Sequence, residues 1–305
     1  MNNTSVSIII PAHNEAQTIG ELVAKIRTGY PGFEVIVIND GSKDKTAEAA
    51  KNAGAHVHSH PYNIGNGASI KTGIRIAQGE ILVFMDGDGQ HDPEDIARLL
   101  EYMPAFDMVV GARTRGSQAS LQRSLGNTIY NRLASYVAKF SVKDLTCGFR
   151  AVKSDIAANF LYLLPNTYSY PTTLTLAVLR SGRSVKYVPI DVHKRKSGNS
   201  RISIYKDGVR FFMIITKICT LYSPFRIFLP VSVMMFCLGL SRYCYTFFAF
   251  HRFTNMSVLL FTTSLIIFMM GLVSEQICQI KFDRSEKDKG LGKTTQRLNQ
   301  HRGDH

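Results

Sequence analysis

Short apolar runs alternate with amphipathic helical patterns along the N-terminal two thirds of the chain. Each run has the length and the Val and Ile content of a buried strand, and between the runs apolar residues recur with helical spacing. The runs are Val6–Ile10, Val35–Ile38, Ala55–His58, Ile81–Met85 and Met108–Val110, and the helical segments are Ala16–Arg27, Lys45–Asn52, Ala68–Ala77 and Pro93–Tyr102. This alternation predicts an α/β fold, a mostly parallel sheet with helices on both faces.

Near residue 226 the chain becomes almost entirely apolar. Residues 227–250 and 256–274 each reach the ~20 apolar residues that a membrane-spanning helix needs. Two such runs joined by so few polar residues are unusual in a soluble domain, which makes a buried helical hairpin the weaker alternative. We therefore expect a two-helix transmembrane hairpin within 226–280, with spans at 227–250 and 256–276.

The segments on either side of the hairpin are basic. Residues 202–225 place three cations on one helical face and apolar residues on the remainder, which predicts an interfacial amphipathic helix, although a core helix gives the same pattern. The tail, 281–305, holds seven Lys or Arg, whereas the connection between the two spans holds few. Because positive charge favours the cytoplasmic side, we expect both the N-terminal domain, 1–201, and the basic tail to be cytoplasmic.

Composition narrows the class of protein further. The chain of 305 residues is 45% hydrophobic and 19% charged, which excludes an intrinsically disordered protein. Its formal net charge is +13, but the cations gather beside the hydrophobic spans without interleaved aromatic residues. Anionic lipid headgroups of the bilayer, and no nucleic acid, are therefore the expected partners. The five cysteines are irregularly spaced and give neither a disulfide framework nor a zinc motif.

Polar clusters follow the first, second, fourth and fifth predicted strands. Residues 11–15 read PAHNE, 39–42 read NDGS, 86–93 read DGDGQHDP and 111–113 read GAR. Any one of them is explained by a turn or a helix cap. The carboxyl ends of parallel strands, however, meet at one edge of a sheet, where ligands bind. The four clusters together therefore predict a ligand site.

Asp86 and Asp88 carry the most chemistry among these clusters. Alternate acids at a strand end present hard oxygen ligands to one side of a loop, which suits Mg²⁺ or Mn²⁺ bound with phosphate oxygens and water, and Gln90 adds a neutral oxygen. An isolated D-x-D is more often a solvated acidic turn. The chain has neither a Walker loop nor G-x-G-x-x-G, which argues against a P-loop NTPase or a dinucleotide-binding fold and favours a metal-bridged diphosphate.

These stretches, together with TCGFR at 146–150, resemble the family 2 glycosyltransferases of the GT-A fold in their order and spacing. More narrowly, the chain is similar to the polyprenyl-phosphate glycosyltransferases, the group that includes dolichol-phosphate mannose synthase and the bactoprenol glucosyltransferases. The resemblance extends from Val6 to about Arg201, and the C-terminal hairpin is also typical of the group. It implies a GT-A, Rossmann-like domain over residues 1–201 that uses Mg²⁺ or Mn²⁺.

The resemblance also implies a role for each residue that matches a family motif. Contacts with the nucleotide-sugar donor are implied for Pro11, His13, Glu15, Ile38, Asp40, Asp86, Gly87, Asp88 and Arg113. The catalytic pair Asp86 and Asp88 would hold the metal together with Gln90. Contacts with phosphate groups, including the acceptor phosphate, are implied for Arg113, Arg123, Asn127, Arg195, Ser200 and Arg201.

The activity implied is inverting transfer of a sugar from a UDP- or GDP-sugar to a polyprenyl phosphate on the cytoplasmic leaflet of a bacterial inner membrane. A phosphate monoester has a second pKa near ~6 and is mostly a dianion at neutral pH, so this acceptor requires no general base. In agreement, the stretch 168–174 has Thr where hydroxyl-accepting relatives tend to carry an acid.

Three other functions stay open from the sequence. A glycosyltransferase of the same fold would act on the hydroxyl of a lipid-linked saccharide if an acid were placed to deprotonate it. A nucleotidyltransferase shares the sheet topology but releases pyrophosphate. A membrane-anchored scaffold would bind nucleotide sugar without turnover. The sugar, the prenol length and the presence of a homo-oligomer are also open.

Overall fold

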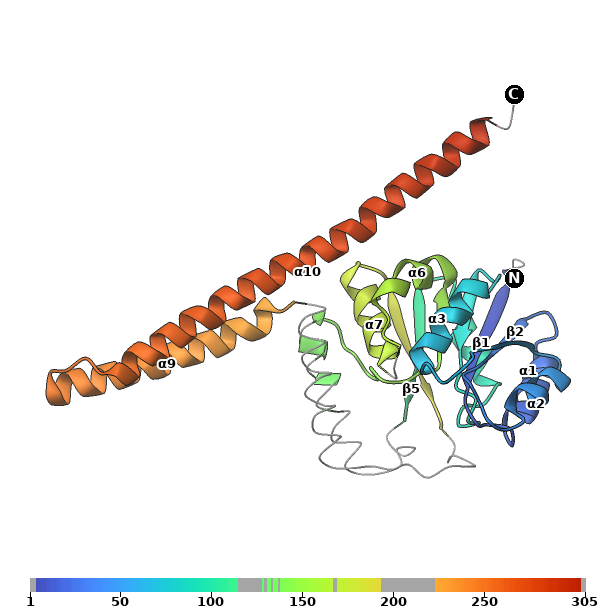
Figure 1. Cartoon of the computed structure of the whole chain (residues 1–305), viewed down its shortest axis with the longest axis horizontal. Helices are drawn as coiled ribbons and strands as arrows, with labels where there is room; N and C mark the ends of the chain where they lie inside the picture. Colours follow the sequence, from blue (N-terminus) through green and yellow to red (C-terminus); the bar gives the residue numbers. More distant parts are fainter. Residues whose placement is uncertain are drawn as a thin grey trace. The chain divides into compact units, whose positions relative to one another are not determined.

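The computed structural model describes residues 4–114, 128, 131–132, 134–136, 138–166, 169–192 and 223–302, with side chains as far as residue 280. The chain forms two compact units, Met1–Ile215 and Thr216–His305 (Figure 1). Most of the predicted interfacial helix over 202–225 lies outside the described residues. The same holds for five predicted phosphate-binding residues: Arg123, Asn127, Arg195, Ser200 and Arg201.

A seven-stranded sheet forms the centre of the first unit. Its strands are β1 (Val6–Ala12), β2 (Glu34–Asn39), β3 (His56–Ser59), β4 (Ile81–Phe84), β5 (Met108–Arg113), β6 (Arg150–Lys153) and β7 (Val185–Ile190), in the order β3-β2-β1-β4-β6-β5-β7. Every pairing is parallel except the two made by β6. The predicted α/β fold with a mostly parallel sheet is therefore confirmed.

Helices connect these strands and cover the sheet. They are α1 (Ile19–Gly29), α2 (Thr46–Asn52), α3 (Asn66–Ile76), α4 (Asp95–Leu100), α6 (Ser154–Asn159) and α7 (Tyr170–Arg180), with a short 3₁₀ turn at Leu161–Leu163. The chain runs outward from β1 to β3 and then returns to β4 on the other side of β1. Because such crossovers are right-handed, α3 lies on the face opposite α1 and α2 (Figure 1). All seven residues of β1 are buried, as a strand covered on both faces requires.

Among the described strands, β6 alone runs antiparallel to its neighbours, and the sequence pattern did not predict it. It lies between β4 and β5, with Arg150 opposite both Phe84 and Val110. Because β6 runs the other way, the chain that enters it, residues 144–149, arrives at the carboxyl ends of β4 and β5. This strand therefore brings a further loop to the edge where the polar clusters were expected.

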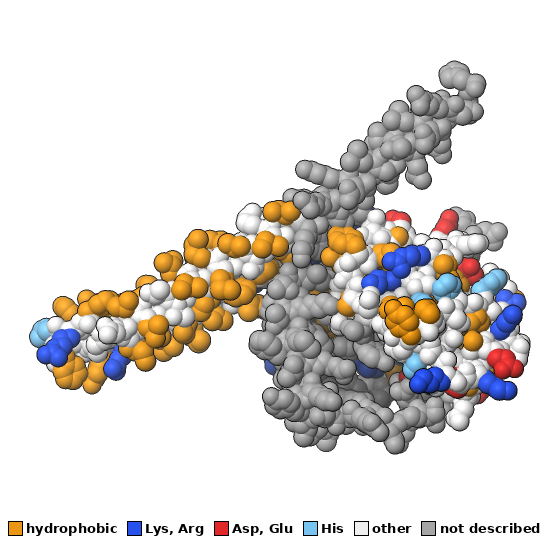
Figure 2. Space-filling view, in the orientation of Figure 1, with side chains coloured by type: hydrophobic (Ala, Val, Ile, Leu, Met, Phe, Trp, Pro, Cys, Tyr) orange, Lys and Arg blue, Asp and Glu red, His pale blue; other side chains and the backbone are white. Residues whose placement is uncertain are grey.

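The second unit is a hairpin of two long helices, α9 (Phe225–Phe250) and α10 (Asn255–Arg302). The segments Phe225–Phe250 and Asn255–Ile280 have mean hydropathies of 1.6 and 2.2 and are each 26 residues long, sufficient to cross a membrane. Hydrophobic side chains cover their exposed surface (Figure 2). The predicted apolar hairpin is confirmed, and α10 continues as a helix through the basic tail as far as Arg302.

Candidate active site

The polar clusters after β1 and β2 are joined directly to each other. The imidazole Nδ1 of His13 lies 2.8 Å from the carbonyl oxygen of Asp40. The backbone N–H of Asn14 donates to the hydroxyl of Ser42 (3.0 Å), and Asn14 Oδ1 accepts from the N–H of Lys43 (2.9 Å). Asn14 has a φ of 56°, in the left-handed region that Asn tolerates better than most residues. The predicted convergence of these two clusters is therefore present.

The predicted nucleotide-binding residues of the first two clusters differ in exposure. Pro11 and Ile38 are opposite each other in the β1–β2 ladder and are buried, whereas His13 is exposed. Glu15 is buried, and its carboxylate accepts a bond from the hydroxyl of Thr18 (3.4 Å). The same hydroxyl lies 3.0 Å from the carbonyl oxygen of Gly87. Thr18 therefore links the first cluster to the acidic loop after β4.

The carboxylate of Asp40 is buried and fixes the loop that leads into α3. Its Oδ1 accepts from the imidazole of His60 (2.8 Å) and from the backbone N–H of Ile64 (2.9 Å), and its Oδ2 accepts from the N–H of Gly65 (2.8 Å). Gly65 has a φ of 123°, which a residue with a side chain adopts only with strain. Asp40 thus has a structural role that the motif alone did not indicate, and its contact with a nucleotide stays a prediction.

Asp86 lies at the end of β4 between two elements that the sequence did not connect with it. Its Oδ1 accepts a long bond of 3.4 Å from the side-chain amide of Asn66, the first residue of α3. On the other side is Gly148, where an added Cβ would lie 2.8 Å from Asp86 Oδ2 and 3.2 Å from the hydroxyl oxygen of Tyr170. Only a glycine at position 148 therefore leaves room for this carboxylate.

Asp88 and Gln90 complete the acidic loop. The backbone N–H of Gln90 donates to Asp88 Oδ1 (3.2 Å), and Gly89 between them has a φ of 70°, so a tight turn presents the acid. Asp86, Asp88 and Gln90 are all half-buried. Gly87 is buried, and an added Cβ there would lie 3.2 Å from the carbonyl oxygen of Pro11.

The donor set of this loop fits a divalent cation that shares its coordination with a diphosphate. Among the described residues, no three His, Cys, Asp or Glu side chains gather in a way that would enclose a metal ion. Two carboxylates are what Mg²⁺ commonly takes from a protein when phosphate oxygens and water complete its shell. The side chain of Asn66, whose amide nitrogen contacts Asp86, also has a buried amide oxygen without a hydrogen-bond partner in the described part of the chain, which is a hard oxygen in addition to those of Asp86, Asp88 and Gln90.

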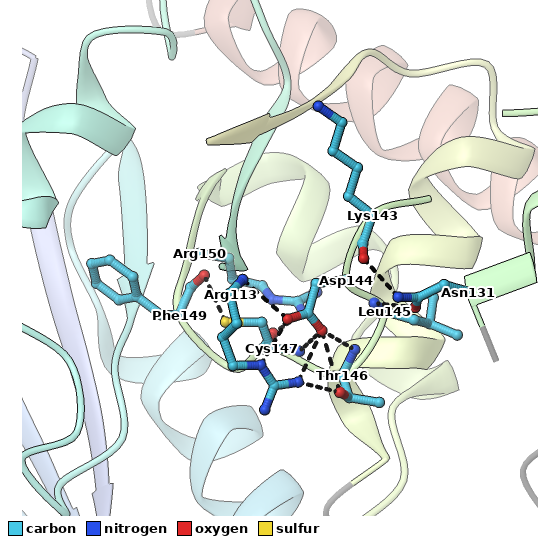
Figure 3. Close-up of polar contacts among 9 residues, drawn as sticks. All are labelled: Arg113, Asn131, Lys143, Asp144, Leu145, Thr146, Cys147, Phe149 and Arg150. Atoms are coloured by element: carbon cyan, nitrogen blue, oxygen red, sulfur yellow. Dashed lines mark hydrogen bonds and ion pairs between the residues drawn. The ribbon is translucent and has the colours of Figure 1, made fainter. Parts of the chain in front are cut away.

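Arg113, at the end of β5, is held by Asp144 (Figure 3). Its Nε lies 2.7 Å from Asp144 Oδ2, and its Nη2 donates to Asp144 Oδ1 (3.0 Å) and to the hydroxyl of Thr146 (2.6 Å). Burial alone would lower the pKa of Arg113 and raise that of Asp144. Their hydrogen bonds and mutual attraction outweigh burial, so the pKa of Arg113 is raised and that of Asp144 is lowered. The pair is therefore ionised throughout the neutral range.

His91 forms part of the buried floor beside the acidic loop. Its ring stacks on Phe149, with centroids 5.0 Å apart and planes 18° from parallel, and its Nδ1 has no hydrogen-bond partner among the described residues. Burial, opposed in part by the charge of Asp88, lowers the pKa of His91 to about 4. The imidazole is therefore neutral at physiological pH.

Helix α7 brings threonines and no acid to its first turn. No Asp or Glu occurs there. Thr172, Thr173 and Thr175 are buried, and the hydroxyls of Thr173 and Thr175 donate to the backbone carbonyls four residues earlier in the chain. The hydroxyl of Thr175 also accepts from the buried guanidinium of Arg150 (2.9 Å). A general base for an acceptor hydroxyl is therefore not supplied by this turn.

Two family descriptions match the chain. "Glycosyl transferase family 2" matches residues 7–161, and "GtrB C-terminal hairpin" matches residues 223–280. The first match covers slightly more than half of the 305 residues. The second covers both apolar segments of the hairpin.

Two undecaprenyl-phosphate sugar transferases are among the relatives that this chain matches. The chain is 28% identical over 215 residues to the undecaprenyl-phosphate mannosyltransferase of Micrococcus luteus, an alignment that covers 65% of this chain and 87% of that protein. It is also 28% identical over 236 residues to the undecaprenyl-phosphate 4-deoxy-4-formamido-L-arabinose transferase of Pectobacterium carotovorum, covering 73% of this chain and 69% of the relative.

Solved structures share the fold. The glucosyl-3-phosphoglycerate synthase of Mycobacterium tuberculosis, crystallised with Mn²⁺, UDP and glucosyl-3-phosphoglycerate, superposes with a TM-score of 0.58 at 19% identity, over 71% of this chain and 79% of that chain. The same synthase with Mg²⁺ and UDP also gives a TM-score of 0.58, at 20% identity and with the same coverage. Taken with the sheet order and the matched domain, these similarities show that the chain belongs to glycosyl transferase family 2 and carries a C-terminal hairpin of the GtrB type.

Proposed function

We propose that this protein transfers a sugar, with inversion, from a UDP- or GDP-sugar to a polyprenyl phosphate on the cytoplasmic leaflet. The observation that carries the proposal is the placement of an acid pair, Asp86 and Asp88, at the same sheet edge as the fixed cation of Arg113. The two acids would hold a divalent cation on the donor diphosphate, and the arginine would bind a phosphate group directly. The undecaprenyl-phosphate transferases among the relatives support this choice of acceptor.

The donor would bind across the carboxyl ends of β1, β2 and β4. Pro11, His13, Glu15, Ile38 and Asp40 would contact or support the base and ribose. Asp86 and Asp88, with Gln90, would hold Mg²⁺ or Mn²⁺ beside the diphosphate, and Gly87 would contact the nucleotide sugar. A cation bound there supplies positive charge that stabilises the departing diphosphate.

The acceptor phosphate would attack the anomeric carbon directly. One phosphate oxygen forms the new bond to that carbon as the bond to the nucleoside diphosphate breaks, so the configuration inverts and no proton has to be removed. The absence of an acid from the first turn of α7 supports an acceptor that is already an anion. Arg113 would contact its phosphate, and we also assign phosphate contacts to Arg123, Asn127, Arg195, Ser200 and Arg201, which lie outside the described residues.

The hairpin would anchor the protein so that both the N-terminal domain and the basic tail face the cytoplasm. Two spans return the chain to the side on which it began, and the excess of Lys and Arg in the tail favours the cytoplasm. A cysteine introduced in the tail should resist an impermeant thiol reagent in intact cells. Labelling of that cysteine from outside would show the opposite orientation.

The test is a transfer assay with purified full-length protein, undecaprenyl phosphate and a panel of radiolabelled UDP- and GDP-sugars. We expect transfer from one donor that stops on addition of EDTA and returns with Mg²⁺ or Mn²⁺. Asp88→Ala should lower kcat by at least about 100-fold, the scale of losing one electrostatic stabiliser of a transition state. The variant should still insert into membranes like the wild type.

Three outcomes would contradict the proposal. Near-normal turnover by Asp88→Ala would remove the metal assignment. Release of pyrophosphate in place of nucleoside diphosphate would indicate a nucleotidyltransferase. Tight binding of a labelled nucleotide sugar without any lipid-dependent turnover would indicate a non-catalytic scaffold.

A further inference from the structure

Asp144 is a buried carboxylate whose orientation is fixed by hydrogen bonds from three residues, Arg113, Thr146 and Cys147. Its Oδ2 accepts the backbone N–H of Arg113 (3.3 Å) as well as the Nε–H of that residue. Its Oδ1 accepts the backbone N–H groups of Thr146 and Cys147, both at 3.1 Å. The side chain of Asp144 is 6% exposed, whereas that of Arg113 is 26% exposed. The acid is thus rigid, and its cationic partner reaches toward solvent.

The two side chains meet along one edge of the guanidinium (Figure 3). Asp144 takes the Nε–Nη2 edge of Arg113 in a bidentate pair, and Thr146 takes the second hydrogen of Nη2. Nη1 makes no hydrogen bond with a residue that the structure describes. An Arg guanidinium has five N–H donors in a fixed plane, so a partner on one edge fixes where the remaining donors lie.

We infer that Asp144 is a positioning residue that holds Arg113 by its Nε–Nη2 edge and so presents the Nη1 group to a phosphate of the substrates. This inference rests on the proposed function, because the phosphate belongs to the acceptor lipid or to the nucleotide donor. Both offer phosphate oxygens, and Arg binds either by charge-assisted hydrogen bonds. We assign the acceptor, since Asp86 and Asp88 already serve the donor diphosphate.

Holding the guanidinium matters because a free Arg side chain has many rotamers. A cation that must be ordered when the substrate arrives loses conformational freedom at that moment and binds more weakly. A preorganised cation avoids this loss. Removal of the charge from Asp144 should therefore weaken substrate binding without changing which atoms take part in the reaction.

The experiment is a double-mutant cycle on the full-length protein, with Arg113→Ala, Asp144→Asn and the double variant. The Michaelis constant for undecaprenyl phosphate is measured in the transfer assay, and the dissociation constants of UDP and GDP with Mn²⁺ are measured by calorimetry. Thr146→Val removes the hydroxyl that accepts from Nη2 (2.6 Å) and donates to Asp144 Oδ1 (3.3 Å), and it provides a milder variant in case Asp144→Asn does not fold.

Asp107→Asn is the matched control. Asp107 precedes β5 at the end opposite Arg113, and it is also fixed by several bonds, from the Ser184 backbone N–H (3.0 Å), the Ser184 hydroxyl (3.1 Å) and the Lys153 ammonium (2.9 Å). Loss of the negative charge at Asp107 should lower the melting temperature of the protein without changing the Michaelis constant for undecaprenyl phosphate.

We expect Asp144→Asn to raise the Michaelis constant for undecaprenyl phosphate about tenfold, Thr146→Val to raise it less, and the double variant to be no worse than Arg113→Ala. The dissociation constants of UDP and GDP should stay within about twofold of wild type, an effect too small to be a lost charge-assisted bond.

Weakened nucleotide binding with an unchanged Michaelis constant for the lipid would place Arg113 on the donor and overturn the acceptor assignment. Additive effects of Asp144→Asn and Arg113→Ala, or an equal effect of Asp107→Asn, would overturn the positioning role. If the wild-type protein transfers no sugar to the lipid, the proposed function fails and this inference fails with it.

Discussion

The burial of His91 makes the stability of the folded protein depend on pH. Its pKa of about 4 in the folded protein lies below the ordinary value of 6.5 because the ring is buried against Phe149. Between these two pH values the unfolded chain binds the proton and the folded chain does not. The free energy of unfolding therefore falls as the pH is lowered from 6.5 toward 4, and above 6.5 this contribution disappears.

We predict that lowering the pH from 7 to 5 lowers the free energy of unfolding of the N-terminal unit by about 2 kcal/mol through His91 alone, because the unfolded chain takes up a proton that the folded chain does not. His91→Phe keeps an aromatic ring for stacking and has no proton to bind, so its stability should fall less over the same interval. Urea unfolding of the full-length protein, followed by circular dichroism at both pH values with EDTA present, measures the difference. Equal losses in the two proteins would show that the folded protein protonates His91 normally.

The sequence indicated several residues that the structure brings to one sheet edge, but not what they touch. The acidic loop and the clusters after β1, β2 and β5 were identifiable because polar residues directly follow apolar runs. Asp144 was not, since its partner Arg113 is 31 residues away and no local pattern links them. Asn66 was missed because the first residue of a helix reads as an ordinary cap. Both contacts depend on tertiary structure that spacing does not encode.

At the scale of elements, the two helices of the hairpin pack through small residues repeated every seven positions. The buried positions are Ser232, Gly239 and Thr246 on α9, and Ser257, Ser264, Gly271 and Cys278 on α10. An added Cβ at Gly271 would lie 2.8 Å from the Cβ of Phe228, so the helices approach closely. Ser232 and Ser264 each donate to the carbonyl oxygen of the other at 2.9 Å. Small residues and reciprocal hydrogen bonds are the means by which helices associate in lipid.

This packing predicts a specific cross-link. With the five native cysteines replaced, Ser232→Cys with Ser264→Cys should form a disulfide under mild oxidation, because the two hydroxyl oxygens are 3.2 Å apart. Ser232→Cys with Ser257→Cys is the control, since seven residues of helix displace the second cysteine by ~10 Å. After proteolysis between the helices, electrophoresis under non-reducing conditions shows whether a disulfide still joins the two fragments. Efficient cross-linking of the control pair would contradict the register described here.

The sequence predicted some strands of the sheet and missed others. Strands β1, β2, β4 and β5 were identifiable as apolar runs rich in Val and Ile, with bounds shifted by a few residues. β3 was expected to be buried, but it lies at the edge of the sheet and is largely exposed. β6 was not identifiable, because it begins with Arg150, a fully buried cation, and β7 was not predicted either. The guanidinium of Arg150 is accommodated by the Pro171 and Cys147 carbonyl oxygens and the Thr175 hydroxyl, which only the folded chain brings together.

At the scale of the whole molecule, the chain joins a family 2 glycosyltransferase domain to a hairpin with two apolar spans. A lipid substrate is confined to the plane of the membrane, and an enzyme anchored there meets it without a search through solution. The hairpin thus agrees with a lipid acceptor. The sequence predicted the two apolar spans well, because spans of this length need no tertiary contact to be recognised.

The most direct measurement compares undecaprenyl phosphate with undecaprenol as acceptor, each supplied with the sugar nucleotide that the panel selects and Mn²⁺. A phosphate dianion attacks without a base, whereas an alcohol has to lose its proton, and the first turn of α7 offers no acid to take it. We predict release of one nucleoside diphosphate per glycosylated lipid with the phosphate and none above background with the alcohol. Comparable release with the alcohol, or none with the phosphate, would contradict a transfer to polyprenyl phosphate.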